Sequence, residues 1–138
     1  MKKIFAVLIF LILVSLHLTA QQPDYRVVFD ITSKDTNAHK TVIRQASGIS
    51  KSDPNAKIEV VLYSQSLDMV LKDRSVVADE VKKLAANKNV AFKVCEVTLK
   101  RHNLDASQLI SGVETVPDGI YEIITKQRQG WGYIKVAQ

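Results

Sequence analysis

Short apolar runs alternate with helix-like segments along most of the chain. Tyr25–Ile31 is rich in β-branched and aromatic residues, which predicts a strand. Four further runs of this kind predict strands at Ile58–Tyr63, Val90–Val94, Gly112–Val116 and Trp131–Val136. Such strands, separated by segments with helical spacing, are typical of a parallel sheet covered on both faces. The pattern therefore predicts an α/β protein, a three-layer α/β/α sandwich with a five-stranded parallel sheet.

Polar residues and glycines indicate where the helices begin and end. Ser75 is the expected N-cap of a helix over residues 77–84. Asp105, with Gln108 three residues later, has the spacing of a capping box. Gly130 is expected to end the last helix as its C′ residue.

The first twenty residues have the pattern of a secretory signal peptide. Two lysines precede an apolar run over residues 4–18, and Ala20 is a small residue at the expected cleavage point. The run is about 15 residues long, whereas an anchor needs roughly 20 to span a bilayer. We therefore expect residues 1–20 to be removed, leaving 21–138 as a single domain. Its expected location is the periplasm or the exterior, without a stable membrane anchor after cleavage.

The charge of the chain is mildly basic. It has 19 lysine and arginine residues against 14 acidic ones, a net charge of +5. Signal cleavage leaves 17 basic residues against 14 acidic ones, a net charge of +3. The basic residues lie in several predicted helices and form no single stripe, which argues against nucleic-acid binding. The single cysteine cannot close an internal disulfide.

That cysteine, Cys95, ends the third predicted strand or follows it directly, and a helix is expected after it. In an open parallel sheet, ligands bind outside the carboxyl ends of the strands. Cys95 therefore belongs to the edge where a site is expected. Other residues at this edge are expected to line the crevice: Thr32, Asn37, Ser64, Gln65, Ser66, Glu96 and Pro117.

Two interpretations of Cys95 follow from the residues alone. At a helix N-terminus, free N–H groups and the helix dipole favour a reactive thiolate, although the neighbouring Glu96 opposes it. Thr98 shares a helix face with Cys95 and could hydrogen-bond the sulfur, whereas His102 lies roughly 10.5 Å further along the axis. In the second interpretation, Cys95 is a small buried side chain, as free cysteines often are. Exposure of the sulfur to solvent distinguishes the two.

Other candidates for chemistry are weaker. His39 has helical spacing with apolar neighbours and is expected to be a half-buried helix residue. Trp131-Gly132-Tyr133 is expected in the core or at a subunit interface. The mature chain's two histidines and one cysteine give no metal-ligand spacing, and no dinucleotide, Walker or nucleophile-elbow glycine pattern is present. The sequence therefore predicts neither a metal nor a cofactor.

The order of elements and several motifs resemble the DsrE/DsrF-like (DsrEFH, YchN-type) family over nearly all of residues 25–136. The most specific features are a cysteine after the third strand, a glycine and proline pattern before the last helix, and an aromatic-glycine ending. They are carried by Cys95, Thr98, Lys100, His102, Gly112-Val113, Val116-Pro117, Gly119 and residues 127–134, together with the segment 63–73.

The resemblance implies a five-stranded parallel sheet in an α/β/α sandwich and assembly into homotrimers or homohexamers. It also implies that Cys95 accepts sulfane sulfur as a persulfide and exchanges it with a donor or acceptor protein. The leading hypothesis is therefore sulfur relay or thiol redox chemistry at Cys95. The alternative is a non-catalytic oligomeric module, for small-ligand binding or assembly, in which Cys95 is inert.

Overall fold

The structure is a computed structural model, and it describes residues 24–136. Strands and helices alternate along this part of the chain, as the apolar pattern predicts. The strands are β1 (Arg26–Ile31), β2 (Lys57–Leu62), β3 (Val90–Cys95), β4 (Glu114–Val116) and β5 (Gly132–Lys135). The α-helices are α2 (Thr36–Ser52), α3 (Ala78–Ala85), α4 (Glu96–Arg101) and α5 (Gly119–Arg128), and the 3₁₀ helices are η1 (Ser66–Met69) and η2 (Ala106–Gln108).

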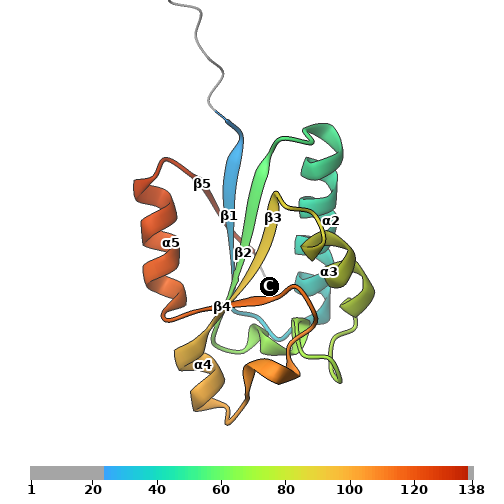
Figure 1. Cartoon of the computed structure of the whole chain (residues 1–138), viewed down its shortest axis with the longest axis vertical. Coiled ribbons are helices and arrows are strands. Elements are labelled where there is room, and N and C mark those ends of the chain that lie inside the picture. The colour runs from blue at the N-terminus through green and yellow to red at the C-terminus, as the bar shows by residue number, and fades with distance from the viewer. Residues whose placement is uncertain (1–23, 137–138) are drawn as a thin grey trace, which may run out of the picture.

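All neighbouring strands pair in parallel, in the order β4-β3-β2-β1-β5. Helices α2 and α3 cover one face of this sheet, and α5 lies on the other (Figure 1). The predicted three-layer α/β fold with a five-stranded parallel sheet is confirmed. Because the chain runs outward from β1 to β4 and then returns to place β5 on the far side of β1, the strand order reverses at the β1–β5 pair.

The main core lies between the sheet and the layer formed by α2, α3 and η1. Alternate residues of each central strand point into it, because side chains along a strand alternate between faces. Phe29 and Phe92 are fully buried there, and α2 contributes an apolar stripe that includes Val42 and Ala46. This layer contains most of the buried apolar residues, so it provides most of the hydrophobic stabilisation.

The opposite face of the sheet has a much smaller apolar cluster. Val28 and Val61 contact Ile123 of α5, and Tyr63 and Trp131 pack at the margin. Trp131, expected in the core or at a subunit interface, is partly buried at the margin of this cluster. Beyond these residues the face is polar, and α5 depends on few apolar contacts.

A buried carboxyl group also lies under α5 and contacts a lysine of that helix. Glu59 of β2 is 2% exposed, and its Oε2 lies 2.8 Å from Nζ of Lys126 on α5. Lys126 also approaches Glu122 at 3.4 Å and lies 4.6 Å from the centre of the Trp131 ring. The other carboxyl oxygen of Glu59 has no hydrogen-bond partner in the described part of the chain. Burial raises the pKa of Glu59 to about 7.

Of the three predicted features of helix ends, two are confirmed by the structure. Asp105 and Gln108 form the predicted capping box, although around a 3₁₀ turn, and Gly130 has the positive φ of a C′ residue. The predicted Ser75 cap is wrong, because α3 begins after Val77. The Ser75 hydroxyl accepts the Val77 N–H, two residues on, before the helix begins, and donates to a carbonyl of η1.

Strand ends differ from the predicted ones by one or two residues. Tyr63 lies just beyond β2, Gly112 lies before β4, and Trp131 lies before β5. These residues continue the apolar or aromatic pattern without pairing in the ladder. The signal-peptide prediction concerns residues 1–20, which lie outside the described residues, so it stays a prediction. No helix within residues 24–136 is long and apolar enough to cross a membrane.

Glu59 should make stability depend on pH. Its pKa is about 7 in the folded chain against 4.5 as the ordinary value, so between these values only the unfolded chain ionises. The free energy of unfolding should therefore fall from about pH 4.5 to 7, by at most about 3 kcal/mol from this group. Glu59→Gln should remove that fall, as urea unfolding at pH 5 and pH 8 would measure.

Glu114→Gln is the matched control, because it makes the same substitution at an exposed position. It should leave the wild-type pH dependence nearly intact. An unchanged pH dependence in Glu59→Gln would contradict the assignment.

Candidate functional site

The carboxyl ends of the strands meet at the edge of the sheet where α4 and η1 lie (Figure 1). Cys95 ends β3 at this edge, as the sequence predicts, and α4 begins at the next residue. Its side chain caps no N–H group of α4. Cys95 is a buried residue, 6% exposed, so little of its side chain reaches solvent.

Gly119, the first residue of α5, covers Cys95. A Cβ atom placed on Gly119 would lie 3.2 Å from Cβ of Cys95 and 3.3 Å from Cγ1 of Val61. The N-terminus of α5 therefore approaches the sheet as closely as a glycine allows. Tyr63 is the neighbouring side chain, with its own Cβ 3.6 Å from the same point.

Tyr63 is a polar residue that interacts electrostatically with Cys95. Burial raises the pKa of Tyr63 to about 12, and the charge of Asp30 and the thiol of Cys95 add to the shift. A phenol with a raised pKa stays protonated, so at neutral pH Tyr63 is a neutral hydrogen-bonding group. Tyr63 therefore brings no charge to the surroundings of Cys95.

The hydroxyl of Thr98 has a different partner from the predicted one. Thr98 is 4% exposed, and its Oγ1 accepts the backbone N–H of Ser64 at 3.4 Å. The contact joins α4 to the loop after β2, and within residues 24–136 no hydrogen bond joins Thr98 to the sulfur. His102 lies at the far end of α4.

The predicted crevice-lining residues do not all line one space. Ser66 is fully buried, and its hydroxyl donates to the carbonyl oxygens of Ile31 and Tyr63, both at 2.9 Å. Glu96 is half-buried and accepts a hydrogen bond from Thr115 at 2.9 Å. Ser66 therefore joins η1 to the ends of β1 and β2, and Glu96 joins α4 to β4.

The remaining predicted residues are distributed around the edge. Ser64 and Gln65 are exposed and border a hollow described below. Asn37 borders a second hollow of about 390 Å³ between α2 and β5. Thr32 belongs to a polar network between β1 and β5, and Pro117 is exposed in the turn before α5.

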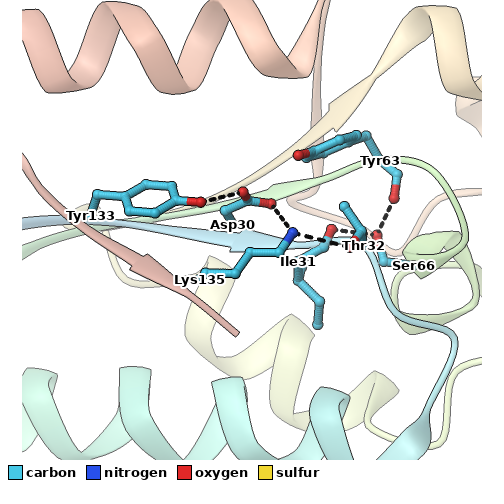
Figure 2. A network of polar contacts seen from close by, with 7 residues as sticks. All are labelled: Asp30, Ile31, Thr32, Tyr63, Ser66, Tyr133 and Lys135. Carbon is cyan, nitrogen blue, oxygen red and sulfur yellow. Dashed lines mark hydrogen bonds and ion pairs between the residues drawn. The ribbon is translucent and has the colours of Figure 1, made fainter. Parts of the chain in front are cut away.

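The network at the β1–β5 reversal is centred on Asp30, which is 5% exposed (Figure 2). Its carboxylate accepts the Tyr133 hydroxyl at 2.7 Å and the Lys135 ammonium at 2.9 Å. Lys135 also donates to Thr32 at 3.0 Å and lies 5.7 Å from the centre of the Tyr63 ring. The hydrogen bond to Asp30 raises the pKa of Tyr133 to about 12. The carboxylate is fully partnered, so this cluster fastens β5 to β1.

An open hollow of about 280 Å³, here called the edge hollow, lies at the carboxyl ends of β1, β2 and β3. Its lining combines basic, polar and apolar side chains from loops that are distant in the sequence: Lys34, Ser64, Gln65, Leu67, Asp68, Arg74, His102 and Leu104. Ser64 has a φ of 61°, a left-handed conformation that costs energy in a residue other than glycine.

Sequence reasoning placed Ser64 and Gln65 at this edge and considered His102 as a possible partner of Cys95, but it named neither Lys34 nor Arg74. Lys34 follows β1 closely enough that strand order could have suggested it. Arg74 could not have been found in this way, because it reaches the edge only through the fold of η1 and the turn after it.

His39 has a structural role near the start of α2. His39 is 1% exposed rather than half-buried, and its Nε2 lies 2.9 Å from the carbonyl oxygen of Ser33. The ring holds the loop after β1 against α2.

Within residues 24–136 no three His, Cys, Asp or Glu side chains are arranged to hold a metal ion.

Five parallel strands with helices on both faces define an α/β protein of the three-layer class. The chain belongs to the DsrE/DsrF-like family, whose model matches residues 26–136. A search of curated proteins gives no match.

Solved structures agree with this assignment. MTH1491 from Methanobacterium thermoautotrophicum is 32% identical, with a TM-score of 0.76, over 81% of this chain and 99% of that one. The ychN protein from E. coli is 16% identical, with a TM-score of 0.69, over 81% and 98% of the two chains. BT1422 from Bacteroides thetaiotaomicron is 14% identical, with a TM-score of 0.69, over 86% and 100%. The last two show similarity of fold alone.

The close approach of α5 to Cys95 predicts a difference between two glycine substitutions. Gly119→Ala should destabilise the protein by roughly 1 to 2 kcal/mol, because the new methyl group meets Cys95 and Val61. Gly48→Ala, in α2, should stabilise it by about 0.5 to 1 kcal/mol, since its Cβ meets nothing within 4 Å. Urea unfolding measures both, and equal effects of the same sign would show that α5 does not pack closely on Cys95.

Proposed function

We propose that this DsrE/DsrF-like chain is a small-ligand-binding module in which the edge hollow receives the ligand and Cys95 is a packing residue. The observation that carries this proposal is a difference in accessibility between Cys95 and the edge hollow, which lie at the same edge of the sheet. Residue Cys95 is only 6% exposed and packs against Gly119, whereas the hollow is open to solvent. A nucleophilic thiol needs access for its partner, and a binding site needs an open cavity with a few polar groups.

The chemistry around Cys95 supports the same conclusion. Its side chain makes no capping bond to α4, and Thr98 bonds a backbone group instead. The like charge of Glu96 opposes a thiolate, although Glu96 is itself hydrogen-bonded to Thr115. A cysteine is activated by a nearby cation or by a hydroxyl that hydrogen-bonds its sulfur. The hydrogen bonds and ion pairs of the described residues bring neither group to the sulfur of Cys95.

Thiol accessibility tests the proposal. Cys95 of the native protein should react with an aromatic disulfide reagent at least about tenfold more slowly than in guanidinium-unfolded protein, because reaction requires α5 to lift. Ellman kinetics measure this ratio without interference, because the chain has one cysteine. Similar rates in both states would contradict the packing role.

Sulfur transfer is the second candidate, favoured by the position of Cys95 at the carboxyl edge in a DsrE/DsrF-like chain. In this reaction the Cys95 thiolate attacks the outer sulfur of a donor persulfide. The donor thiol leaves, and Cys95 becomes the persulfide. The step requires a state in which the N-terminus of α5 has moved off the sulfur.

Intact-mass analysis distinguishes the two candidates. The binding-module proposal predicts that the native protein gains no sulfur from a sulfane-sulfur donor under conditions that modify a free thiol. A gain of one sulfur atom that is reversed by reductant and lost in Cys95→Ser would instead establish transfer. Gly119→Ala, which crowds the α5 N-terminus, should then increase the gain.

Assembly into a homotrimer or homohexamer is part of the proposed function. Helix α5 exposes Ile120, Tyr121 and Ile124, at 56%, 67% and 41%, and Tyr133 of β5 is 43% exposed. Large apolar side chains gathered on one element are typical of interfaces. This surface of α5 is therefore the proposed contact between copies.

A charge on α5 should weaken that assembly. Ile124→Lys is expected to reduce the mass measured by size-exclusion chromatography with light scattering, because it places an ammonium in an apolar contact. Val76→Lys is the control, since Val76 is 54% exposed and lies before α3. A wild-type protein of monomeric mass, or an equal loss in both variants, would contradict the α5 interface.

A further inference from the structure

The edge hollow has a basic side made from three separate segments. Lys34 follows β1, Arg74 follows η1, and His102 follows α4. Within residues 24–136, the side chains of Lys34 and His102 form no ion pair or hydrogen bond with another residue. Their hydrogen-bonding capacity is therefore free for a ligand.

One acidic side chain is present on the same lining. Oδ1 of Asp68 lies 3.2 Å from Nη1 of Arg74, and both side chains are about half exposed. Such an exposed pair contributes little energy, and a guanidinium has five N–H donors, so Arg74 retains donors for a second acceptor. The pair therefore orients Arg74 without removing its capacity to bind an anion.

The rest of the lining differs in character. Leu67 and Leu104 provide an apolar wall, and Ser64 and Gln65 provide polar groups between the wall and the basic side. Ser64 holds its left-handed conformation beside this space. Strained backbone conformations concentrate at ligand-binding sites, where the surrounding structure maintains them.

We propose that the edge hollow binds a small organic anion, a carboxylate or phosphate monoester with a short apolar tail. The proposal rests on the proposed ligand-binding function and specifies its ligand class. The charged oxygens contact Lys34, Arg74 and His102, because guanidinium and ammonium groups are the side chains that bind such oxygens best. The tail contacts the leucines. The volume of about 280 Å³ is at the lower end of ligand pockets, which limits the ligand to a small molecule.

Nuclear magnetic resonance titration of the purified ¹⁵N-labelled protein tests this inference. Four probes are compared at constant pH and ionic strength: butyrate, n-propyl phosphate, inorganic phosphate and the neutral butyramide. Butyrate and propyl phosphate should shift the amides of Ser64, Gln65 and Leu104. Butyramide lacks the charge and should bind at least about tenfold more weakly. Inorganic phosphate lacks the tail and should bind more weakly than propyl phosphate, and the stronger of the two organic anions identifies the head group.

Charge-matched variants separate a specific site from general attraction. Lys34→Gln and Arg74→Gln should each raise the Kd of the better anion by about 5- to 20-fold. Lys40→Gln and Arg44→Gln remove the same charges from exposed positions of α2 outside the hollow, and should change it less than about twofold. Thermal unfolding of all four variants should match the wild type, which shows that lost affinity is not lost folding.

Three results would overturn the inference in distinguishable ways. Equal binding of butyramide at the same amides would leave the edge hollow as a ligand site and reject an anionic ligand. Equal effects of Lys34→Gln and Lys40→Gln would show attraction to net charge and reject the site. The absence of amide shifts with every probe at millimolar concentration would reject the anion class and the proposed ligand-binding function together.

Discussion

The position of α5 depends on the contact between Lys126 and the buried carboxyl group of Glu59. The apolar contacts beneath this helix come from Val28, Val61 and Ile123, which is a small area for a helix of ten residues. A carboxyl group under a helix is costly unless it is paired or protonated, and burial raises the pKa of Glu59 although Lys126 is its partner. The protonation state and the pairing of Glu59 therefore both affect how firmly the helix remains on the sheet. The closure over Cys95 and the exposed apolar surface of α5 both follow from that position.

The two faces of the sheet differ in how their contacts stabilise the helices packed on them. The face covered by α2 and α3 has a dry apolar core and holds the strands in register. The α5 face has buried charges, tyrosines with raised pKa values and a single close glycine contact. Local opening concentrates where few apolar contacts must be broken. Motions that expose Cys95 therefore involve α5. The lining of the edge hollow includes no residue of α5, so the hollow can bind without them.

Much of the fold could be predicted from the sequence, because strands buried on both faces are nearly continuous in apolar residues. The position of Cys95 at the end of β3 followed from the same pattern. Its burial did not follow, since the covering residue, Gly119, is 24 positions later and acts through the docking of α5. Asp35 caps α2, but nothing in the local sequence separates it from the polar residues around it.

The candidate site was less predictable than the fold for a similar reason. Ser64 and Gln65 directly follow a strand, so topology alone places them at the edge. Arg74 and Leu104 follow irregular segments whose paths depend on tertiary contacts, such as the isolated bridge between Leu71 and Leu109. Ser66 illustrates the opposite error: it follows the same strand as Ser64, but its hydroxyl is turned inward to the carbonyl oxygens of Ile31 and Tyr63, at the ends of β1 and β2.

The place of Trp131 has an optical consequence. It is the chain's single tryptophan, it packs at the margin of the cluster beneath α5, and the ammonium of Lys126 lies over its ring. Indole emission responds to hydration and to nearby charge, and both would change at this ring if α5 moved away from the sheet. The protein therefore carries an intrinsic fluorophore at the contact that holds the helix. Docking of α5 can be followed by fluorescence without a label, separately from the main core.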